Sequence, residues 1–432
     1  MSLERICDSL AVKATLITFL TLSLFAGILY TVGEAKTTIE LWTVQHLWYK
    51  RMEEAIEQFM LEYPDIEIDI VYVPGSWGEL HEKLMLAAAT DGLPTIAWSH
   101  TEKNIHLEDK DLLAPIPWDR LPYGVEDFMN YEQMYNYNGE YYRFPWGMLN
   151  GVLYYNRFLL DQSGVSEYDL PTSFEEMTRL ARKLTQMDAS GDVTQYGFAN
   201  GPIWQWFDVF YQHGEYLFKE DGTPNLASPA GINSMEVLFD LLEAGGRRQG
   251  VQNAGFRDGN VVMQYEWAWM AAQIREHRPD LDFGIAVPPT ISGSLTPAFG
   301  RMNCEEGFCV FKQASPEEQE AAWKLLAYLL DDDDFLLDLS KTGIGLTPKY
   351  ELWSDPVVKD DPALWVQAQT LPYSVYQADV QFVVDILGGL MGQAERGEIS
   401  PQQALMTADV ELAAELARSK RRINERNYVF ED

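Results

Sequence analysis

A strand, a helix and a second strand follow one another early in the chain, and their order constrains the fold more than any other feature. Residues 37–44 (TTIELWTV) and 66–73 (IEIDIVYV) alternate apolar and polar side chains with the period of a strand. Between them, helical spacing places five residues on one stripe: Met52, Ala55, Ile56, Phe59 and Met60. A helical crossover between neighbouring strands gives parallel pairing in a right-handed unit. The chain therefore opens with an α/β sheet domain.

The same alternation continues along the chain. Three segments have a capping Ser or Thr at their start, as helices do: 171–186, 315–330 and 400–416. Short apolar segments with strand character lie between the helices: 93–98, 151–156, 283–289 and 307–311. A chain of 432 residues is too long for one ordinary domain. The pattern predicts an α/β protein with two lobes and several chain crossings between them.

The N-terminal segment indicates where the protein works. Basic residues precede an uncharged, apolar run at 14–32, and Gly33 and Ala35 supply the small residues of a cleavage site. This pattern predicts that residues 1–35 are a signal peptide removed after export. The alternative is a retained membrane anchor, because 19 uncharged residues are enough for a bilayer that needs ~17–25. Both interpretations place the body of the protein outside the cytoplasm.

Only two cysteines remain once Cys7 is removed with the signal peptide. Cys304 and Cys309 would then lie in an oxidising compartment, where disulfides persist, and we predict a local disulfide between them. Free structural thiols are the alternative. Zinc sites need four ligands at characteristic spacings and redox pairs read C-x-x-C, so the spacing favours neither.

The charge and the missing signatures limit the function classes. With 66 acidic and 32 basic residues, the formal charge of −34 argues against binding to nucleic acid or to anionic lipid. The sequence contains no G-x-S-x-G, P-loop, H-E-x-x-H or G-x-G-x-x-G motif. We therefore predict no catalytic residue, no cofactor and no metal site.

The distribution of tryptophan is the positive signal. Eight of the 13 tryptophans mostly lie at the ends of strand-like segments or in turns: Trp48, Trp77, Trp98, Trp146, Trp204, Trp206, Trp267 and Trp269. An indole face packs against the C–H face of a sugar, while neighbouring carboxylates, amides and Arg pair with its hydroxyls. Carbohydrate is a natural ligand for this mixture. The alternative is that individual rings fill the core.

Two carboxylates lie beside these rings and suggest a second function class. Asp208 follows WQWF, and Glu266 lies in YEWAW. Glycoside hydrolysis uses a pair of carboxylates, as acid and as base or nucleophile. A secreted glycan-active enzyme that uses Glu266 is therefore the alternative to a binding protein.

The order of the segments resembles that of the family 1 extracellular solute-binding proteins of ABC importers, which include maltose-binding and glycerol-phosphate-binding proteins. The resemblance covers nearly the whole chain after residue 35. It rests on eight segments in the family's order: FMLEYPDIEIDIVYV, NGEYYRFPWGMLNGVLYYNRFLLDQSGV, LPTSFEEMTRLARKLT, DVTQYGFA, FRDGNVVMQYEWAWM, FGIAVPP, EEQEAAWKLLAYLL and GIGLTPKYEL.

The resemblance implies a type II periplasmic-binding-protein-like fold, with two discontinuous α/β lobes joined by a hinge. One lobe would comprise residues 36–147 and 297–345, and the other residues 148–296 and 346–432. The ligand would bind in the cleft between the lobes and be captured by their closure. Such proteins are monomers that perform no covalent chemistry and deliver their solute to the permease subunits of an ABC importer.

The resemblance also implies which residues contact the ligand. Their positions follow strands, precede crossings or lie in the ligand loop of the second lobe: Trp48, Trp98, Ser99, Trp146, Trp204, Trp206, Asp208, Glu266, Trp267, Trp269, Arg301 and Asn303. The rings would stack on sugar faces, and the polar side chains would bind hydroxyls. An oligosaccharide is the expected ligand. A polyol, a glycerol phosphodiester or a peptide is the alternative, although Arg301 is the one cation that the resemblance nominates for an anionic group.

Overall fold

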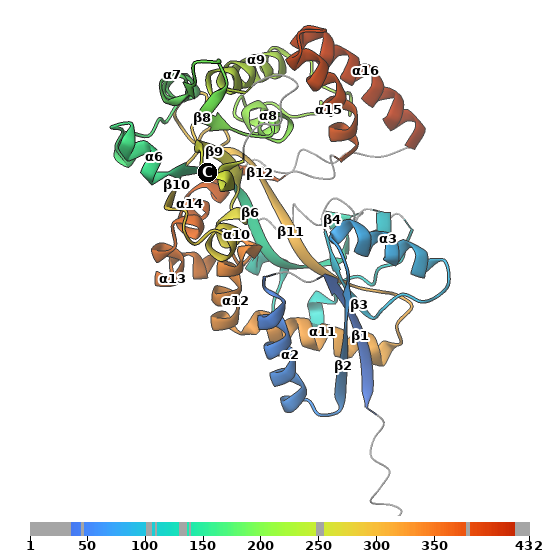
Figure 1. Cartoon of the computed structure of the whole chain (residues 1–432). Helices are drawn as coiled ribbons and strands as arrows, with labels where there is room; N and C mark the ends of the chain where they lie inside the picture. Colours follow the sequence, from blue (N-terminus) through green and yellow to red (C-terminus); the bar gives the residue numbers. More distant parts are fainter. Residues whose placement is uncertain are drawn as a thin grey trace, which may run out of the picture.

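The computed structural model describes eight parts of the chain: residues 36–44, 47–100, 106–108, 110–128, 136–137, 140–247, 255–376 and 381–419. They form two lobes of strands and helices, between which the long strands β6 (Arg143–Asn156) and β11 (Gly300–Val310) run (Figure 1). The segment predicted as a signal peptide, residues 1–35, lies outside the described residues. No helix within the described ranges is long and apolar enough to cross a membrane.

The opening of the first lobe confirms the predicted parallel unit. Strand β1 (Thr37–Val44) pairs in parallel with β2 (Ile66–Val73) along its whole length and with β3 (Ile96–Ser99) on its other side. Helix α2 (Tyr49–Glu62) makes the crossover, and α3 (Trp77–Ala88) connects β2 to β3. Of the helical stripe predicted from the sequence, Met52, Ile56 and Phe59 are buried on α2, and Ala55 and Met60 are half-buried.

The strands of both lobes follow one hydrogen-bonded path, in the order β2-β1-β3-β11-β6-β9-β8-β7. The remaining members of this sheet are β7 (Gln186–Met187), β8 (Val193–Ala199), β9 (Val261–Trp267), β10 (Phe283–Ala286) and β12 (Ser374–Tyr376). Strands β10 and β12 pair with β6 and β11 respectively. A separate hairpin joins β4 (Asn136–Tyr137) and β5 (Glu140–Tyr141). The path is continuous because β6 changes partner along its length: residues 143–150 pair with β11, and residues 151–155 pair with β9.

Helices cover the strands in each lobe (Figure 1). The helices after α3 are α6 (Arg157–Gln162), α7 (Phe174–Leu184), α8 (Pro202–Tyr211), α9 (Pro229–Ala244), α10 (Met270–His277), α11 (Pro316–Asp331), α12 (Asp333–Leu339), α13 (Pro356–Asp360), α14 (Pro362–Thr370), α15 (Gln381–Glu395) and α16 (Pro401–Ser419). A π-helical turn, η5 (Ser340–Ile344), follows α12. Single-turn helices are η1 (Trp118–Arg120), η2 (Val125–Asp127), η3 (Glu167–Asp169), η4 (Phe256–Asp258), η6 (Tyr350–Ser354) and η7 (Leu371–Tyr373).

The predicted helix starts are confirmed as capping boxes. At the start of α7, the Ser173 hydroxyl accepts the backbone N–H of Glu176, and the Glu176 carboxylate accepts the backbone N–H of Ser173. The same reciprocal pair forms between Ser315 and Glu318 before α11. Each box satisfies two backbone donors that a helix leaves without an intrahelical partner, so local sequence fixes these boundaries.

The two lobes meet closely at a third crossing, where the segment after η5 lies against the middle of β6. Met148 and Leu346 exchange two backbone hydrogen bonds of 2.8 Å. A Cβ atom on Gly147 would overlap the carbonyl oxygen of Ile344, and one on Gly345 would overlap that of Met148. Gly345 also has a φ of +94°, which favours glycine. Backbone therefore packs directly on backbone here.

The predicted disulfide between Cys304 and Cys309 is wrong. Both residues belong to β11, which begins at Gly300, well before the strand predicted at 307–311. Five residues of extended strand separate the two Cα atoms by about 16 Å, whereas a disulfide requires ~4.4–6.8 Å. Cys309 has a free, buried thiol that donates to the carbonyl oxygen of Ala97 at 3.6 Å, and burial raises its pKa to about 12. The side chain of Cys304 lies outside the described part of the structure.

Candidate functional site

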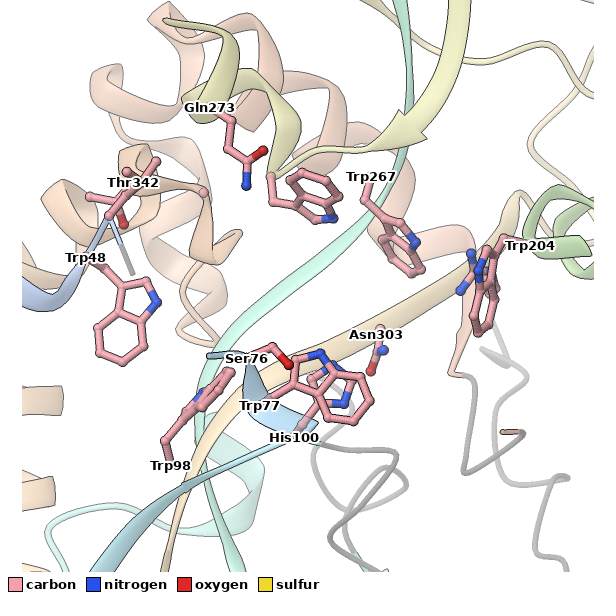
Figure 2. A pocket seen from close by; sticks show the side chains of 14 residues that line it. Trp48, Ser76, Trp77, Trp98, His100, Trp204, Trp267, Gln273, Asn303 and Thr342 are labelled. Atoms are coloured by element: carbon pink, nitrogen blue, oxygen red, sulfur yellow. The ribbon is translucent and has the colours of Figure 1, made fainter. Parts of the chain in front are cut away.

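A cavity of about 390 Å³ opens between the two lobes (Figure 2). Fourteen residues line it: Leu47, Trp48, Ser76, Trp77, Trp98, His100, Trp204, Trp267, Trp269, Gln273, Arg301, Asn303, Thr342 and Gly343. Six of them are tryptophans, three from each lobe. This concentration of indole rings is the main chemical property of the cavity.

The first lobe contributes two pairs of rings. Trp48 lies directly before α2 and meets Trp98 of β3 edge to face, with ring centroids 6.3 Å apart. Trp77 begins α3 and stacks on His100, with centroids 4.3 Å apart and planes at 14°. These contacts tie the start of each helix to the end of β3, so the rings face the cavity together (Figure 2).

A capping box places Trp77. Ser76 caps α3, its hydroxyl accepting the backbone N–H of Gly78 at 3.2 Å, while Glu79 accepts the backbone N–H of Ser76 at 2.8 Å. The helix therefore begins at Trp77, and Ser76 itself reaches the cavity. This start is encoded locally, because the motif needs only the residues of one helical turn.

The guanidinium of Arg301, on the crossing strand β11, lies between two indole rings of the second lobe. Its central carbon is 4.8 Å from the ring centroid of Trp204, on α8, and 4.2 Å from that of Trp267, at the end of β9. Stacking of a guanidinium on indole faces is a favourable cation–π arrangement. All three side chains line the cavity.

Asp208 lies behind Arg301, outside the cavity lining. Its carboxylate accepts the Tyr265 hydroxyl at 2.5 Å and the backbone N–H of Arg301 at 2.7 Å, and lies 3.6 Å from the Arg301 Nε atom. Burial raises the pKa of the Asp208 carboxyl above its ordinary value, although Arg301 and the two hydrogen bonds act in the opposite direction. Burial and the neighbouring carboxylate raise the pKa of Tyr265 well above its ordinary value, so this phenol remains a donor.

Asn303 supplies a polar group with unused bonding capacity. It follows Arg301 on the same side of β11 and is 4% exposed. Its Oδ1 atom is buried and has no hydrogen-bond partner within the described ranges. A buried amide oxygen without a partner costs free energy, and a ligand hydroxyl in the cavity would offset that cost.

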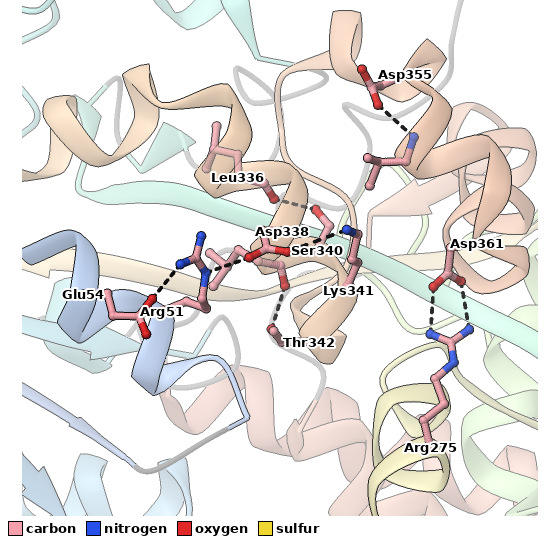
Figure 3. A network of polar contacts seen from close by, with 12 residues as sticks. Arg51, Glu54, Arg275, Leu336, Asp338, Ser340, Lys341, Thr342, Asp355 and Asp361 are labelled. Carbon is pink, nitrogen blue, oxygen red and sulfur yellow. Dashed lines mark hydrogen bonds and ion pairs between the residues drawn. The ribbon is translucent and has the colours of Figure 1, made fainter. Parts of the chain in front are cut away.

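The third crossing adds Thr342 and Gly343 to the lining. Asp338 of α12 forms an ion pair with Arg51 of α2 at 2.7 Å and with Lys341 at 3.6 Å (Figure 3). The Thr342 hydroxyl donates to the carbonyl oxygen of Leu339 at 2.6 Å. The ion pair between Arg51 and Asp338 holds α12 against α2, and Thr342 lies near Trp48 (Figure 2).

The structure brings seven of the twelve predicted site residues together in this cavity: Trp48, Trp98, Trp204, Trp267, Trp269, Arg301 and Asn303. The other five lie outside its lining: Ser99, Trp146, Trp206, Asp208 and Glu266. The carbonyl of Ser99 accepts the Arg143 guanidinium at 3.0 Å. Glu266 accepts the backbone N–H of Trp267 at 3.0 Å, and burial raises the pKa of its carboxyl.

Two of the predicted rings are core residues. Trp146 packs edge to face on Phe308, at 5.4 Å, within the first lobe. Trp206 is fully buried, stacks on Phe210 at 5.1 Å, and donates its indole N–H to the carbonyl oxygen of Gly231 at 3.0 Å. These two positions follow the alternative that the sequence left open, in which large rings fill the core.

Seven lining residues were not among the predicted contacts: Leu47, Ser76, Trp77, His100, Gln273, Thr342 and Gly343. Trp77 belonged to the set of turn-associated tryptophans, so its type and its place before a helix were a usable signal. His100 follows the end of β3 directly, beside the predicted Ser99. Thr342 and Gly343 had no such signal, because only the third crossing brings them here.

Comparisons with known proteins agree with this architecture. The sequence profile described as bacterial extracellular solute-binding protein matches residues 48–334. An arabinooligosaccharide-binding protein of Halalkalibacterium halodurans is 21% identical over 355 residues, which cover 76% of this chain and 75% of that protein.

Two solved structures share the fold. UgpB from Mycobacterium tuberculosis, in complex with glycerophosphocholine, superposes with a TM-score of 0.76 at 18% identity, over 89% of this chain and 100% of that chain. The cyclic alpha-maltosyl-1,6-maltose binding protein from Arthrobacter globiformis superposes with a TM-score of 0.75 at 20% identity, over 89% and 100%. Since the family profile covers well over half of the sequence, this chain belongs to the bacterial extracellular solute-binding proteins.

Proposed function

We propose that this protein is the extracytoplasmic substrate-binding component of an ABC importer, and that it captures a carbohydrate, an oligosaccharide, for delivery to a membrane permease. The observation that carries this proposal is the set of six tryptophans in one cavity between the lobes. No covalent chemistry is required of such a protein. Its task is to select a solute and to present it.

The cavity chemistry supports a sugar ligand. Indole faces pack on the apolar faces of sugar rings, and sparse polar groups fix the orientation of the ligand by binding its hydroxyls. Asn303, Gln273 and Ser76 supply amide and hydroxyl groups for this purpose. The names of the relatives, which bind arabinooligosaccharide and cyclic maltosyl-maltose, favour an oligosaccharide over a single ring.

The seven predicted residues in the lining are the proposed ligand contacts, together with Trp77. Trp48, Trp77 and Trp98 would hold one face of the ligand, and Trp204, Trp267 and Trp269 the other. Because these two sets belong to different lobes, closure would bring them onto opposite faces of a bound sugar. Binding energy would thereby drive the lobes together.

The proposed lobes comprise residues 36–147 with 297–345 and residues 148–296 with 346–432. Strand β6 changes partner beyond residue 150, and the backbone is in close contact around Gly147 and Gly345. Both observations support lobe boundaries near these residues. The lobes would rotate relative to one another about this contact.

Residues 1–35 would act as a signal peptide, and the protein would work as a monomer in the periplasm or at the extracellular face of the membrane. The family description, as an extracellular protein, supports this location. The partners would be the permease subunits of an ABC importer.

A glycan-active enzyme is less well supported. Glycosidases place two carboxyl groups about 5–9.5 Å apart around the scissile bond. The lining residues of the described cavity include neither Asp nor Glu, and Glu266 accepts a hydrogen bond from its neighbour's backbone. The nearby carboxylate of Asp208 is engaged by Tyr265 and Arg301.

The test is a ligand panel measured by isothermal titration calorimetry and thermal unfolding. The panel contains maltose, maltotriose, arabinobiose, arabinotriose, glycerol, glycerophosphocholine and a tripeptide. A bound sugar at 100 times its Kd should stabilise the protein by about 2.7 kcal/mol. Trp267→Ala should weaken binding, whereas Trp365→Ala, at an exposed site on α14, should leave it unchanged.

The outcomes separate the alternatives. Saturable binding of a panel sugar without cleavage products supports the proposal. Binding of glycerol, glycerophosphocholine or the tripeptide alone replaces the ligand class and keeps the binding function. Release of cleavage products from a sugar replaces the function class.

A further inference from the structure

The Trp204–Arg301–Trp267 stack is supported from behind by a buried pair, Asp208 and Tyr265. Both belong to the second lobe, on α8 and β9, whereas Arg301 lies on the crossing strand β11. The side chains of Arg301 and Asp208 are 2% and 4% exposed. Asp208 therefore meets Arg301 through protein contacts, away from the space that a ligand would enter.

The electrostatics explain why this pair is present. A buried guanidinium loses its hydration, and it is stable only if an anion and hydrogen bonds compensate for that loss. Asp208 lies 3.6 Å from the Nε atom of Arg301 and accepts its backbone N–H at 2.7 Å. Tyr265 donates to the other carboxylate oxygen of Asp208 at 2.5 Å. The carboxylate of Asp208 thus accepts a hydrogen bond from the backbone of Arg301 and forms an ion pair with its side chain.

The surrounding backbone leaves little room for this arrangement to shift. A Cβ atom on Gly300 would lie 2.9 Å from Asp208 Oδ1, and one on Gly151 would overlap the Tyr265 hydroxyl. At the end of α8, the Gln212 amide donates to the carbonyl oxygen of Phe299 at 2.7 Å. The strand that carries Arg301 is therefore attached to α8 at two points, through Asp208 and through Gln212.

We infer that Asp208 and Tyr265 are positioning residues, which fix the Arg301 guanidinium between Trp204 and Trp267 so that one wall of the binding cavity is assembled before ligand enters. The inference rests on the proposed sugar-binding function of this cavity. A preassembled wall removes the cost of ordering three side chains during binding. Because Asp208 balances the charge of Arg301, the wall presents a flat face without net charge, which suits a neutral sugar ring.

The first arm of the test needs no ligand. Trp204→Phe and Trp267→Phe assign the two indole N–H resonances in the ¹H–¹⁵N spectrum of the full-length protein, and Arg301→Met gives their positions when the guanidinium is absent. Asp208→Asn should move both resonances toward the Arg301→Met positions, and Tyr265→Phe should move them less. Unchanged Trp204 and Trp267 resonances in Asp208→Asn would overturn the inference.

A matched control separates positioning from general destabilisation. Asp409 is a half-buried carboxylate of the second lobe, and it accepts the backbone N–H groups of Leu226 and Ala227 at 2.8 and 3.0 Å, outside the cavity lining. Asp409→Asn should lower the thermal midpoint and leave both indole resonances in place. If it moves them as Asp208→Asn does, the shift reports stability and the inference fails.

The second arm measures the Kd for maltotriose and arabinotriose. Asp208→Asn should raise the Kd at least tenfold, about 1.4 kcal/mol, and Asp409→Asn should leave it within about twofold. If Asp208 acts through Arg301, then the double variant with Asp208→Asn and Arg301→Met should lose no more affinity than Arg301→Met alone. Additive losses, or a wild-type Kd in Asp208→Asn, would overturn the inference. If the wild-type protein binds neither these nor the other panel sugars, the proposed function fails, and the indole resonances alone decide whether Asp208 positions Arg301.

Discussion

Trp77 stacks on His100 with ring centroids 4.3 Å apart, and both side chains line the cavity between the lobes. The pair joins the start of α3 to the residue that follows β3. It gives the first lobe a planar surface opposite the tryptophans of the second lobe. A sugar held between the lobes would meet a flat ring on each side.

Replacing Trp77 should therefore weaken ligand binding more than folding. Trp77→Ala removes the half-buried indole, and we expect a loss of about 1–2 kcal/mol in binding, or roughly five- to thirtyfold in Kd. Trp77→Phe keeps a stacking ring and should recover part of this loss. Calorimetry with maltotriose and arabinotriose checks the order of the three proteins. Equal affinities in all of them would show that the stack has no part in binding.

The free thiol of Cys309 gives a prediction opposite to the one that a disulfide would give. Treatment with dithiothreitol should change neither the thermal midpoint nor the Kd, because no covalent link is broken. Burial raises the thiol pKa to about 12, so in the native protein this cysteine should react slowly with thiol reagents and rapidly after unfolding. Cys309→Ser should destabilise by about 1–3 kcal/mol, since it places a more polar group in a buried site. A drop in midpoint on reduction would contradict this account.

The contact between Gly345 and Met148 should be sensitive to a single methyl group. In Gly345→Ala the new Cβ atom meets the Met148 carbonyl and the backbone keeps a left-handed φ, so we expect a loss of about 2–4 kcal/mol in the free energy of unfolding. Gly397 has a φ of +70° with nothing within 4 Å of its ideal Cβ position, and Gly397→Ala isolates the backbone strain, about 1 kcal/mol. Urea unfolding measures both. Equal losses would mean that overlap at the crossing contributes nothing.

Glu266 should make stability depend on pH in a defined direction. Burial raises the pKa of its carboxyl in the folded protein, so the folded state binds the proton more tightly than the unfolded state. Stability contributed by this group is therefore present below its ordinary pKa and is lost as the pH rises through its raised pKa. The side chain in Glu266→Gln does not titrate. The stability of this variant relative to wild type should therefore increase as the pH is raised from 4 to 7.

The same variant tests the catalytic alternative. Because Glu266 lies outside the cavity lining, Glu266→Gln should leave the Kd for a bound sugar within about twofold. Denaturation at both pH values and calorimetry at neutral pH provide the two readouts. A constant stability difference at the two pH values would contradict the assigned direction of the pKa shift, and abolished turnover of a sugar would establish the enzyme.

Local patterns determined much of the fold. The alternation at residues 37–44, the helical stripe between the first two strands, and the capping Ser or Thr at the start of 171–186 each predicted an element that the structure contains. These signals work because strand period, helix period and capping depend on residues a few positions apart. The segment order also predicted the two-lobed architecture through its resemblance to a family. None of these signals depends on distant contacts.

The tertiary structure decided which face of each element meets the cavity. Trp204 and Trp206 stand two positions apart on α8, about 200° around the helix, so one lines the cavity while the other is buried against Gly231. Both tryptophans were predicted as ligand contacts, because a tryptophan-rich segment does not indicate which ring faces the cavity. The extended conformation that separates Cys304 from Cys309 likewise depends on distant residues, because β11 pairs with β3 and with β6.

The sequence by itself therefore determined the α/β class, several of the elements and the supply of indole rings. Only the tertiary structure decided that Asp208 supports Arg301 from behind and that Thr342 reaches the cavity from a third crossing. The physical reason is the range of the interactions. Periodicity and capping act within a turn or a strand, whereas the cavity is made by side chains up to about 300 positions apart, which meet only when both lobes and all three crossings have formed.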